Sequence, residues 1–139
     1  MAKRLEAFVI GDPDLQYCVQ FAGNSKYEDW VDGARPCSIY GYFSGRPGDY
    51  PYYGIAGSVG KAKAIQAIKI KCNKSYDIFY RVHIQGKGWL NWTKNGSPAG
   101  NGYGARIEAI QIKKVAKDKY YAPTIIPGNA PQRAYYQSK

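Results

Sequence analysis

KRLEAFVI (residues 3–10), KAIQAIKI (63–70) and ARIEAIQI (105–112) are three copies of one short pattern. Each copy contains Leu or Ile, then Glu or Gln, then Ala, then Phe or Ile, and it ends two residues later in Ile. Internal self-similarity of this kind is the signature of a repeat architecture. We interpret each stretch as the last strand of a repeat unit and call it a closing strand.

Two of the closing strands are preceded by the same further features. Short turns containing Ala-Gly, AGSVG (56–60) and AGNG (99–102), lie upstream of them. Before those turns, Trp30 and Trp92 are each followed by a glycine turn, and before these lie the strand-like stretches YCVQFAG (17–23) and FYRVHIQG (79–86). The sequence therefore predicts repeat units at about 13–74 and 75–114 inside a single domain, 1–139.

A third unit is expected to be divided between the two ends of the chain. Its closing strand is residues 3–10, so its remaining strands would come from residues 115–139. A ring of three units would remove open sheet edges. We therefore expect an all-β fold with three-fold pseudo-symmetry, prism-like or trefoil-like. The alternative is a two-sheet sandwich in which residues 119–139 form an extended arm.

Composition agrees with strands and turns rather than helices. The 139 residues include 14 Tyr, 16 Gly and 8 Pro, and 45% of the chain is hydrophobic, which favours a folded β-rich domain. No apolar run has the length of a membrane span, and the first residues do not resemble a secretory signal. The expected location is cytoplasmic or virion-associated, or reached by a non-classical route of release.

Residues suited to catalysis are scarce. His83 is the single histidine, and it lies inside an expected strand with no nucleophile motif nearby. Cys18, Cys37 and Cys72 have no metal-ligand spacing, so we expect reduced thiols, although one disulfide stays open as an alternative. The sequence predicts no enzymatic activity, no cofactor and no metal site.

Residues 86–114 contain a spaced set of Trp, Gly and closing-strand residues: Gly88, Trp89, Trp92, Gly96, Ala99, Gly100, Gly104, Arg106, Glu108, Ala109, Ile110 and Ile112. In these positions the segment resembles the clostridial hydrophobic-W (ChW) repeat. The first unit is a weaker match, with Tyr27 where the first Trp belongs, Ala64 in place of the Arg and Gln66 in place of the Glu. The N-terminal copy keeps Arg4, Glu6 and Ala7.

The resemblance implies an all-β module that binds a ligand or a cell surface and is not an enzyme. ChW repeats occur in tandem and commonly in secreted clostridial proteins, whereas this chain has no recognisable signal peptide and has a large insertion. The family supplies no ligand residues to transfer. A bacteriophage product or a component of a larger assembly is equally compatible with the repeats.

Candidate ligand-binding residues follow from the side-chain types. Trp89 occurs only in the second unit and is expected to be an exposed ring that stacks on a sugar face, with Asn91 and Asn95 bonding to hydroxyls. The insertion between Gly33 and Ala56 supplies further rings, and long loops in compact domains are often functional. Its candidate residues are Tyr40, Tyr42, Tyr50, Tyr52 and Tyr53. The alternative is that these rings cover a sheet or a subunit contact.

Other repeated residues are expected to build the core. Trp30 and Trp92 hold the same place in both units, which suggests buried anchors. The shared closing-strand residues complete this set: Ala7, Ala67, Ala109, Ile68 and Ile110. Simple alternation along 105–112 puts Ile107 and Ala109 on one face and Ile110 and Ile112 on the other. Arg106 and Glu108 are two residues apart and are expected to pair.

The net charge of +10 indicates either a solvated surface or an anionic partner. Our leading hypothesis is a lectin-like module that binds a glycan or an anionic cell-wall polymer by aromatic stacking. The alternatives are a structural protein that forms a homo-oligomer or a larger assembly, such as a virion coat, and a sponge for an anionic nucleotide-like ligand. Sequence-specific nucleic-acid binding is not expected, since no recognised reading motif is present.

Overall fold

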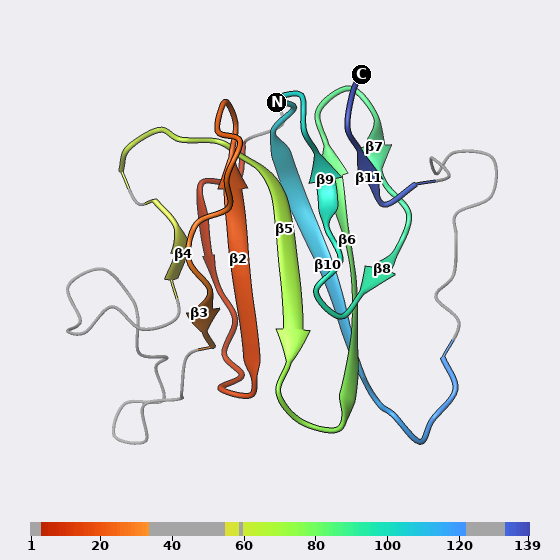
Figure 1. Cartoon of the computed structure of the whole chain (residues 1–139). Coiled ribbons are helices and arrows are strands. Elements are labelled where there is room, and N and C mark those ends of the chain that lie inside the picture. Colours follow the sequence, from red (N-terminus) through yellow and green to blue (C-terminus); the bar gives the residue numbers. More distant parts are fainter. Residues whose placement is uncertain (1–3, 34–54, 59, 122–132) are drawn as a thin grey trace.

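The computed structural model describes residues 4–33, 55–58, 60–121 and 133–139, and the secondary structure in these ranges consists of strands (Figure 1). The all-β prediction is confirmed. The strands are β1 (Ala7–Val9), β2 (Leu15–Phe21), β3 (Val31–Asp32), β4 (Ile55–Gly57), β5 (Ile65–Cys72), β6 (Tyr76–Ile84), β7 (Gly88–Trp89), β8 (Thr93–Lys94), β9 (Ala99–Asn101), β10 (Ile107–Ala116) and β11 (Tyr135–Tyr136).

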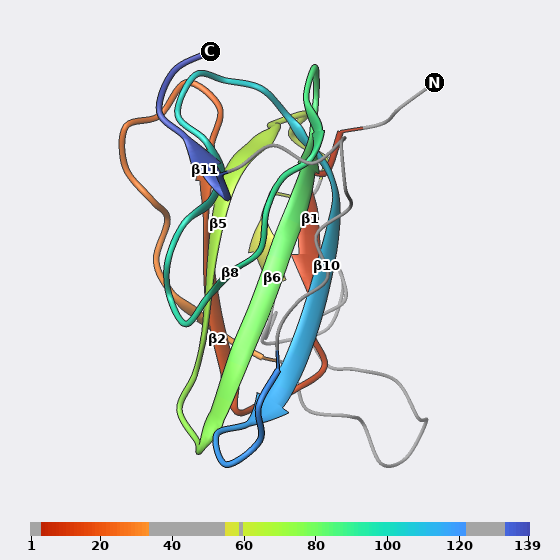
Figure 2. The same ribbon diagram turned by 90° about the vertical axis from the view of Figure 1, so that its right-hand side faces the viewer.

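Two long antiparallel pairs dominate the fold. β2 and β5 lie at the centre of a sheet of order β11-β9-β5-β2-β3, while β6 and β10 form a sheet with the short strands β7 and β8. β1 and β4 make a separate two-stranded sheet. Figure 2 shows the β2–β5 pair and the β6–β10 pair as two facing layers. None of these sheets is closed, and the specific prism or trefoil arrangement is not confirmed.

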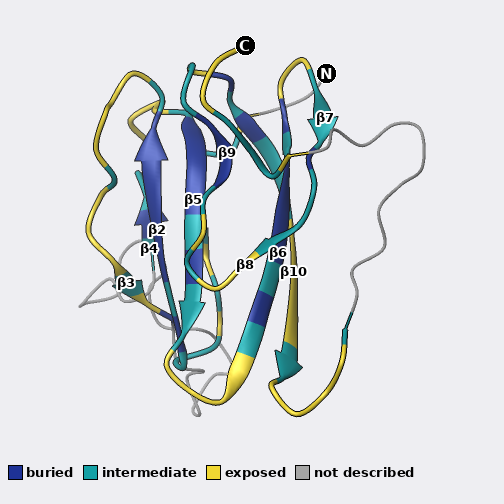
Figure 3. Cartoon of the chain, turned by 45° about the vertical axis from the view of Figure 1, so that its right-hand side comes forward, coloured by how far each residue is buried: buried dark blue, intermediate teal, exposed yellow. Residues whose placement is uncertain are grey.

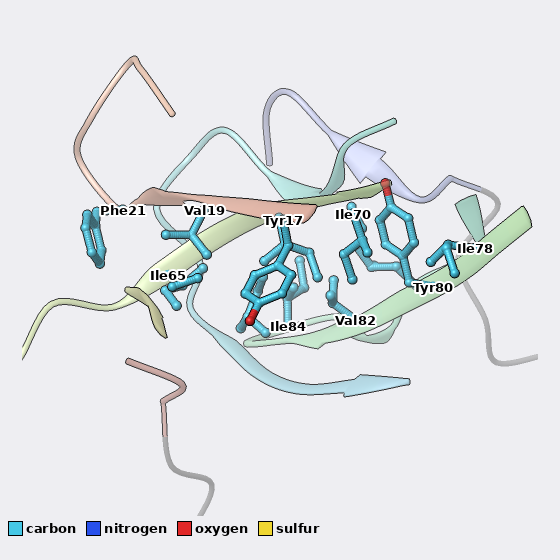
Figure 4. Close-up of a cluster of buried hydrophobic side chains, with 14 of the residues drawn as sticks. Tyr17, Val19, Phe21, Ile65, Ile70, Ile78, Tyr80, Val82 and Ile84 are labelled. Atoms are coloured by element: carbon cyan, nitrogen blue, oxygen red, sulfur yellow. The ribbon is translucent and has the colours of Figure 1, made fainter. Parts of the chain in front are cut away.

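The core lies between the two layers (Figure 4). Every second side chain of β6 faces the core, and these side chains are completely buried: Ile78, Tyr80, Val82 and Ile84. Figure 4 shows Tyr17, Val19 and Phe21 of β2 in the same cluster, on the side of the other layer. Leu15 of β2 is also buried in this core. Burial of such side chains contributes about 1.5–3 kcal/mol each, so this double row is the main source of stability.

Both long closing strands contain a β-bulge at the shared Gln or Glu. Gln66 is the extra residue of β5 and Glu108 is the extra residue of β10, because each partner strand skips that position. A bulge leaves one residue unpaired and so resets the alternation of faces. Consequently the apolar residues on both sides of the bulge in β5 all point inward and have no exposed surface: Ile65, Ile68 and Ile70.

Because of its bulge, the last closing strand does not have the two faces that simple alternation predicted. Ile107 precedes Glu108 and belongs to the same inner face as Ile110 and Ile112, not to the face of Ala109. Ile107 is fully buried and Ile110 packs against the core. Simple alternation failed here because one unpaired residue changes the phase of every residue after it.

Each of the two Ala-Gly strands pairs with the closing strand that comes before it in the chain. In β4 and β1 the partners are Gly57 and Ala7, and in β9 and β5 they are Gly100 and Ala67. The register is thus the same at both places. We call β4 and β9 the AG strands.

The three closing strands begin next to one another at equivalent residues. The backbone N–H of Leu5 donates to the carbonyl of Ile107 (2.7 Å), and the N–H of Ile65 donates to the carbonyl of Leu5 (3.2 Å). Ile65 and Ile107 are completely buried, and Leu5 packs against the core. The repeat pattern of the sequence therefore corresponds to a spatial cluster of repeat positions.

The C-terminal residues lie on the second unit. β11 pairs in parallel with β9, and Figure 1 shows this dark blue strand beside β9. β1, which was expected to share a unit with residues 115–139, is paired with β4 instead. Within the described ranges there is no helix of the length and apolar character needed to cross a membrane.

Candidate functional site

The outer faces of β2 and β6 are covered by the segments that carry the aromatic residues. Leu90 donates its backbone N–H to Val82 (2.9 Å), and Glu28 donates its N–H to Val19 in the same way (2.8 Å). Val82 and Val19 hold equivalent places in their antiparallel strand pairs, β6–β10 and β2–β5. Tyr27 is therefore the structural counterpart of Trp89, and Trp30 is the counterpart of Trp92.

In the second unit a buried arginine lies between the two tryptophans. The guanidinium carbon of Arg81 is 4.8 Å from the centre of the Trp89 ring and 5.1 Å from that of Trp92. Its Nε donates to Oε1 of Gln111 (2.6 Å). Arg81 is only 6% exposed, and its Nη1 has no hydrogen-bond partner among the described residues. Cation–π contacts of a desolvated guanidinium are worth about 2 kcal/mol, which helps to offset this burial.

Charged residues continue the cluster along the same face. Glu108 lies 3.1 Å from Nδ1 of His83 and 3.3 Å from Nε of Arg106, so the expected pair of Arg106 and Glu108 is confirmed. His83 also contacts the Trp89 ring edge-on, with ring centres 5.4 Å apart. His83 therefore orients Trp89 as part of a structural network.

In the first unit the cations come from the closing strand. Nζ of Lys69 lies 4.0 Å from the ring centre of Tyr27, and Nζ of Lys71 lies 4.0 Å from that of Trp30. Trp30 is 41% exposed. This unit thus presents an accessible aromatic surface with an ammonium group held against it.

The predicted polar ligand residues are engaged within the protein. Oδ1 of Asn95 accepts the N–H of Ile78 (2.9 Å), and its Nδ2 donates to Asp77 (2.8 Å). Oδ1 of Asn91 accepts the N–H of Trp92 (2.9 Å). These bonds stabilise the turns that carry the tryptophans. The five predicted tyrosines Tyr40, Tyr42, Tyr50, Tyr52 and Tyr53 lie outside the described residues.

The predicted core residues differ in burial. Ala67 and Ile68 are completely buried. Four of the others are only half-buried: Ala7, Trp92, Ala109 and Ile110. Trp30 is exposed, so its assignment as a core anchor is wrong. The reason is that Trp30 lies over the outer face of β2, whereas the core lies on the inner face. Trp89, expected to be the exposed ring, is half-buried against Arg81 and His83.

Two shallow hollows flank Tyr103, a residue that the sequence analysis did not select. One, of about 410 Å³, is lined by Gln85, Gly86, Lys87, Tyr103, Gly104, Ala105 and Lys139. The other, of about 430 Å³, is lined by Gly23, Asn24, Ser25, Gln66, Gly102, Tyr103 and Gly104. Tyr103 follows an AG strand in a glycine-rich stretch, and that placement was the available signal. Both hollows are separate from the tryptophan clusters.

Burial favours the neutral form of two other ionisable groups of the interior, a thiol and a phenol. Burial raises the pKa of the Cys18 thiol to about 11 and that of the Tyr80 hydroxyl to about 12. Cys18 and Cys72 are both free thiols. Within the described ranges there is no group of three or more His, Cys, Asp or Glu side chains that could hold a metal ion. The distinctive chemistry of the described surface is therefore the pairing of aromatic rings with cations.

Comparison with known proteins adds one finding. No curated protein and no solved structure matches the chain. Residues 83–115, from the end of β6 through most of β10, match the model of the family Clostridial hydrophobic W. This match agrees with the resemblance drawn from residues 86–114, and the chain is similar to the ChW family over this segment.

Proposed function

We propose that this protein is a non-enzymatic, lectin-like binding module that recognises an anionic glycan or cell-wall polymer by aromatic stacking. The observation that carries the proposal is the exposed ring of Trp30 with Lys71 held 4.0 Å above it. Trp89, Trp92 and Arg81 form the corresponding aromatic and cationic group of the second unit. The second unit thus holds the same combination of rings and a cation, with its arginine buried and its rings half-buried.

The chemistry of this surface suits a charged sugar. An aromatic ring stacks on the apolar C–H face of a pyranose, as it does on other flat groups. An adjacent ammonium group forms charge-assisted hydrogen bonds to a phosphate or carboxylate. A polymer that carries both groups at regular spacing would engage the two units together, and two linked sites raise the overall affinity above that of either one.

We propose further that the three closing strands are arranged about a pseudo-three-fold axis. The contacts among Leu5, Ile65 and Ile107 and the shared register of the two AG strands support this arrangement. In this view the third position holds a closing strand, β1, without the remaining strands of a unit. The pseudo-three-fold arrangement would then place the two aromatic surfaces at equivalent positions of the fold.

The binding proposal is tested with single aromatic substitutions. Trp30→Ala should weaken binding to an anionic cell-wall polymer, such as a teichoic acid, at least roughly ten-fold, because each ten-fold loss corresponds to about 1.4 kcal/mol of lost contact. Trp89→Ala should also weaken it. Binding is measured on a glycan and cell-wall polymer array and then by titration calorimetry at two salt concentrations.

Tyr120→Ala is the matched control, because Tyr120 is 93% exposed and lies outside both clusters. This variant should bind like the wild type, and the affinity of the wild type should fall with rising salt. Unchanged affinity of a folded Trp30→Ala protein, or no bound polymer on the array, would contradict the proposal.

A second candidate function, assembly with other chains, is favoured by a different observation. Ile112 on β10 is 39% exposed, and β10 is the terminal strand of its sheet. An open edge with an exposed apolar residue is suited to strand addition.

A further inference from the structure

Two closing strands accept an AG strand in one common geometry. Gly57 lies opposite Ala7 and Gly100 lies opposite Ala67. Both glycines have positive φ, at 102° and 124°. A Cβ placed on them would be 2.3 Å from the carbonyl oxygen of Glu6 and 2.2 Å from that of Gln66. We call each of these pairing sites on a closing strand a slot. The two slots have the same structure, and both require glycine in the AG strand.

The third closing strand, β10, has the sequence features of a slot. Ile107, Glu108, Ala109 and Ile110 match Ile65, Gln66, Ala67 and Ile68 position by position, and β10 has the same bulge as β5. Strand β6 pairs with one edge of β10. The other edge accepts the N–H of Leu5 at Ile107, and within the described part of the chain no strand pairs with it at residues 108–112. Both AG strands of the structure are already in use.

Exposure marks the difference between the filled and the unpaired strand. Ile70 of β5 is completely buried, whereas its counterpart Ile112 is 39% exposed. Ala67 is likewise completely buried, and Ala109 is half-exposed. Figure 3 shows β5 largely in the colours of buried and intermediate residues and much of β10 as exposed. β10 therefore leaves exposed the surface that an AG strand covers on β5.

We propose that the edge of β10 at residues 108–112, which has no partner strand among the described residues, is a docking site for an AG strand supplied by another polypeptide chain that carries a ChW-type unit. The incoming glycine would face Ala109, in the register seen at Ala7 and Ala67, and the strand would cover Ile112. The ion pair of Lys114 with Asp12 (2.8 Å) marks the end of this site. The proposal rests on the pseudo-three-fold arrangement proposed above and is independent of ligand binding by Trp30.

The test uses the full chain and a peptide with the sequence of its own AG strand, Ser97–Tyr103, with blocked ends. Isotope-labelled protein is titrated with the peptide and followed by amide NMR. We expect saturable shifts of the amide signals of residues 108–112. A control peptide in which the glycine corresponding to Gly100 is valine should cause no shift, because its Cβ would meet the backbone of β10.

Two matched variants report whether the free chain fills the slot itself. Ala67→Leu places a larger side chain in a filled slot and should lower the urea midpoint clearly. Ala109→Leu should leave the midpoint nearly unchanged but abolish the peptide shifts. The proposal is overturned if Ala109→Leu lowers the midpoint as much as Ala67→Leu does, since an intramolecular strand then covers β10. It is also overturned if neither peptide shifts the β10 signals, or if both do so equally.

Discussion

Arg81 and Cys18 hold equivalent positions on β6 and β2, and this one difference decides where each unit obtains its cation. In the second unit Arg81 extends from β6, the first strand of the β6–β10 pair, and lies between two tryptophans. In the first unit Cys18 is too short and uncharged, and Lys69 and Lys71 of the closing strand take the role. The aromatic surface is thus retained while its charge is supplied from the neighbouring strand.

Gln66 explains why one shared polar residue belongs inside the protein. Its Nε2 donates to Oε1 of Gln20 (2.9 Å), and its Oε1 accepts the N–H of Gly104 (2.8 Å). A buried amide without such partners would destabilise the fold by about 1–3 kcal/mol. The bulge residue Gln66 therefore links the β2–β5 pair to the turn that follows β9, and its role is structural.

Ionisation of Tyr80 is expected to lower the stability of the fold at alkaline pH. Burial raises its pKa from the ordinary value of 10.0 to about 12. The unfolded chain loses the hydroxyl proton first, so the stabilising contribution is present below pH 10 and is lost as the pH rises from 10 to 12. We expect the free energy of unfolding to fall by roughly 1.4 kcal/mol per pH unit over this interval.

Urea unfolding at pH 9, 10 and 11 measures this effect. Tyr80→Phe is the control, because it keeps the ring and removes the ionisable group. The variant should be less stable at pH 9, where the hydrogen bond from Tyr80 to the carbonyl of Ser97 is lost, but its stability should fall less steeply above pH 10. Equal slopes for the two proteins would show that Tyr80 does not carry the dependence.

At the scale of elements, the contact between an AG strand and the closing strand before it is the unit that repeats. The glycine brings the two backbones so close that no side chain fits between them. The alanines opposite, Ala7 and Ala67, leave room for the same approach. Small residues on both strands therefore have a joint steric cause.

Substituting these glycines should separate steric contact from backbone strain. Gly57→Ala and Gly100→Ala should each lower the free energy of unfolding by about 3 kcal/mol or more, because strain at positive φ and a collision with backbone atoms add together. Gly86 also has positive φ, at 86°, but nothing lies within 4 Å of an added Cβ. Gly86→Ala should therefore destabilise by only about 1–2 kcal/mol. Urea denaturation measures all three variants, and equal losses would disprove the close approach.

For the whole molecule, the C-terminal residues act as a tie across the second unit. The N–H groups of Asn91, Gly100 and Gly102 donate to the carbonyls of Arg133, Ala134 and Tyr136, at 2.9–3.1 Å. Lys87 also lies 4.5 Å from the ring centre of Tyr136. The last seven residues thus connect the tryptophan segment to the AG strand of the same unit.

Deletion of residues 133–139 should destabilise the protein by about 2–4 kcal/mol, since three backbone hydrogen bonds are lost at about 0.5–1.5 kcal/mol each. The amides of Gly100 and Gly102 should lose protection against hydrogen exchange. Deletion of Ser138 and Lys139 alone is the control and should change neither quantity much. A seven-residue deletion with unchanged stability would exclude the tie.

Local patterns in the chain were sufficient to predict the all-β class and the segment that resembles the ChW family. Periodicity reports which residues can share a face, and the closing strands repeat it three times. The same patterns placed Tyr27 where Trp89 stands in the other unit, and the backbone pairing agrees. These features depend on neighbours along the chain, so an amino-acid sequence carries them directly.

Exposure and partnership were decided only by the tertiary structure. Trp30 and Trp92 have equivalent places, yet just Trp30 is exposed, since packing between distant strands determines what covers each ring. The bulges at Gln66 and Glu108 changed the inner face of the closing strands without a signal in the hydrophobic pattern. The pairing of β11 with β9 joins segments more than thirty residues apart. Such contacts arise from the competition of whole surfaces for burial, which no local pattern records.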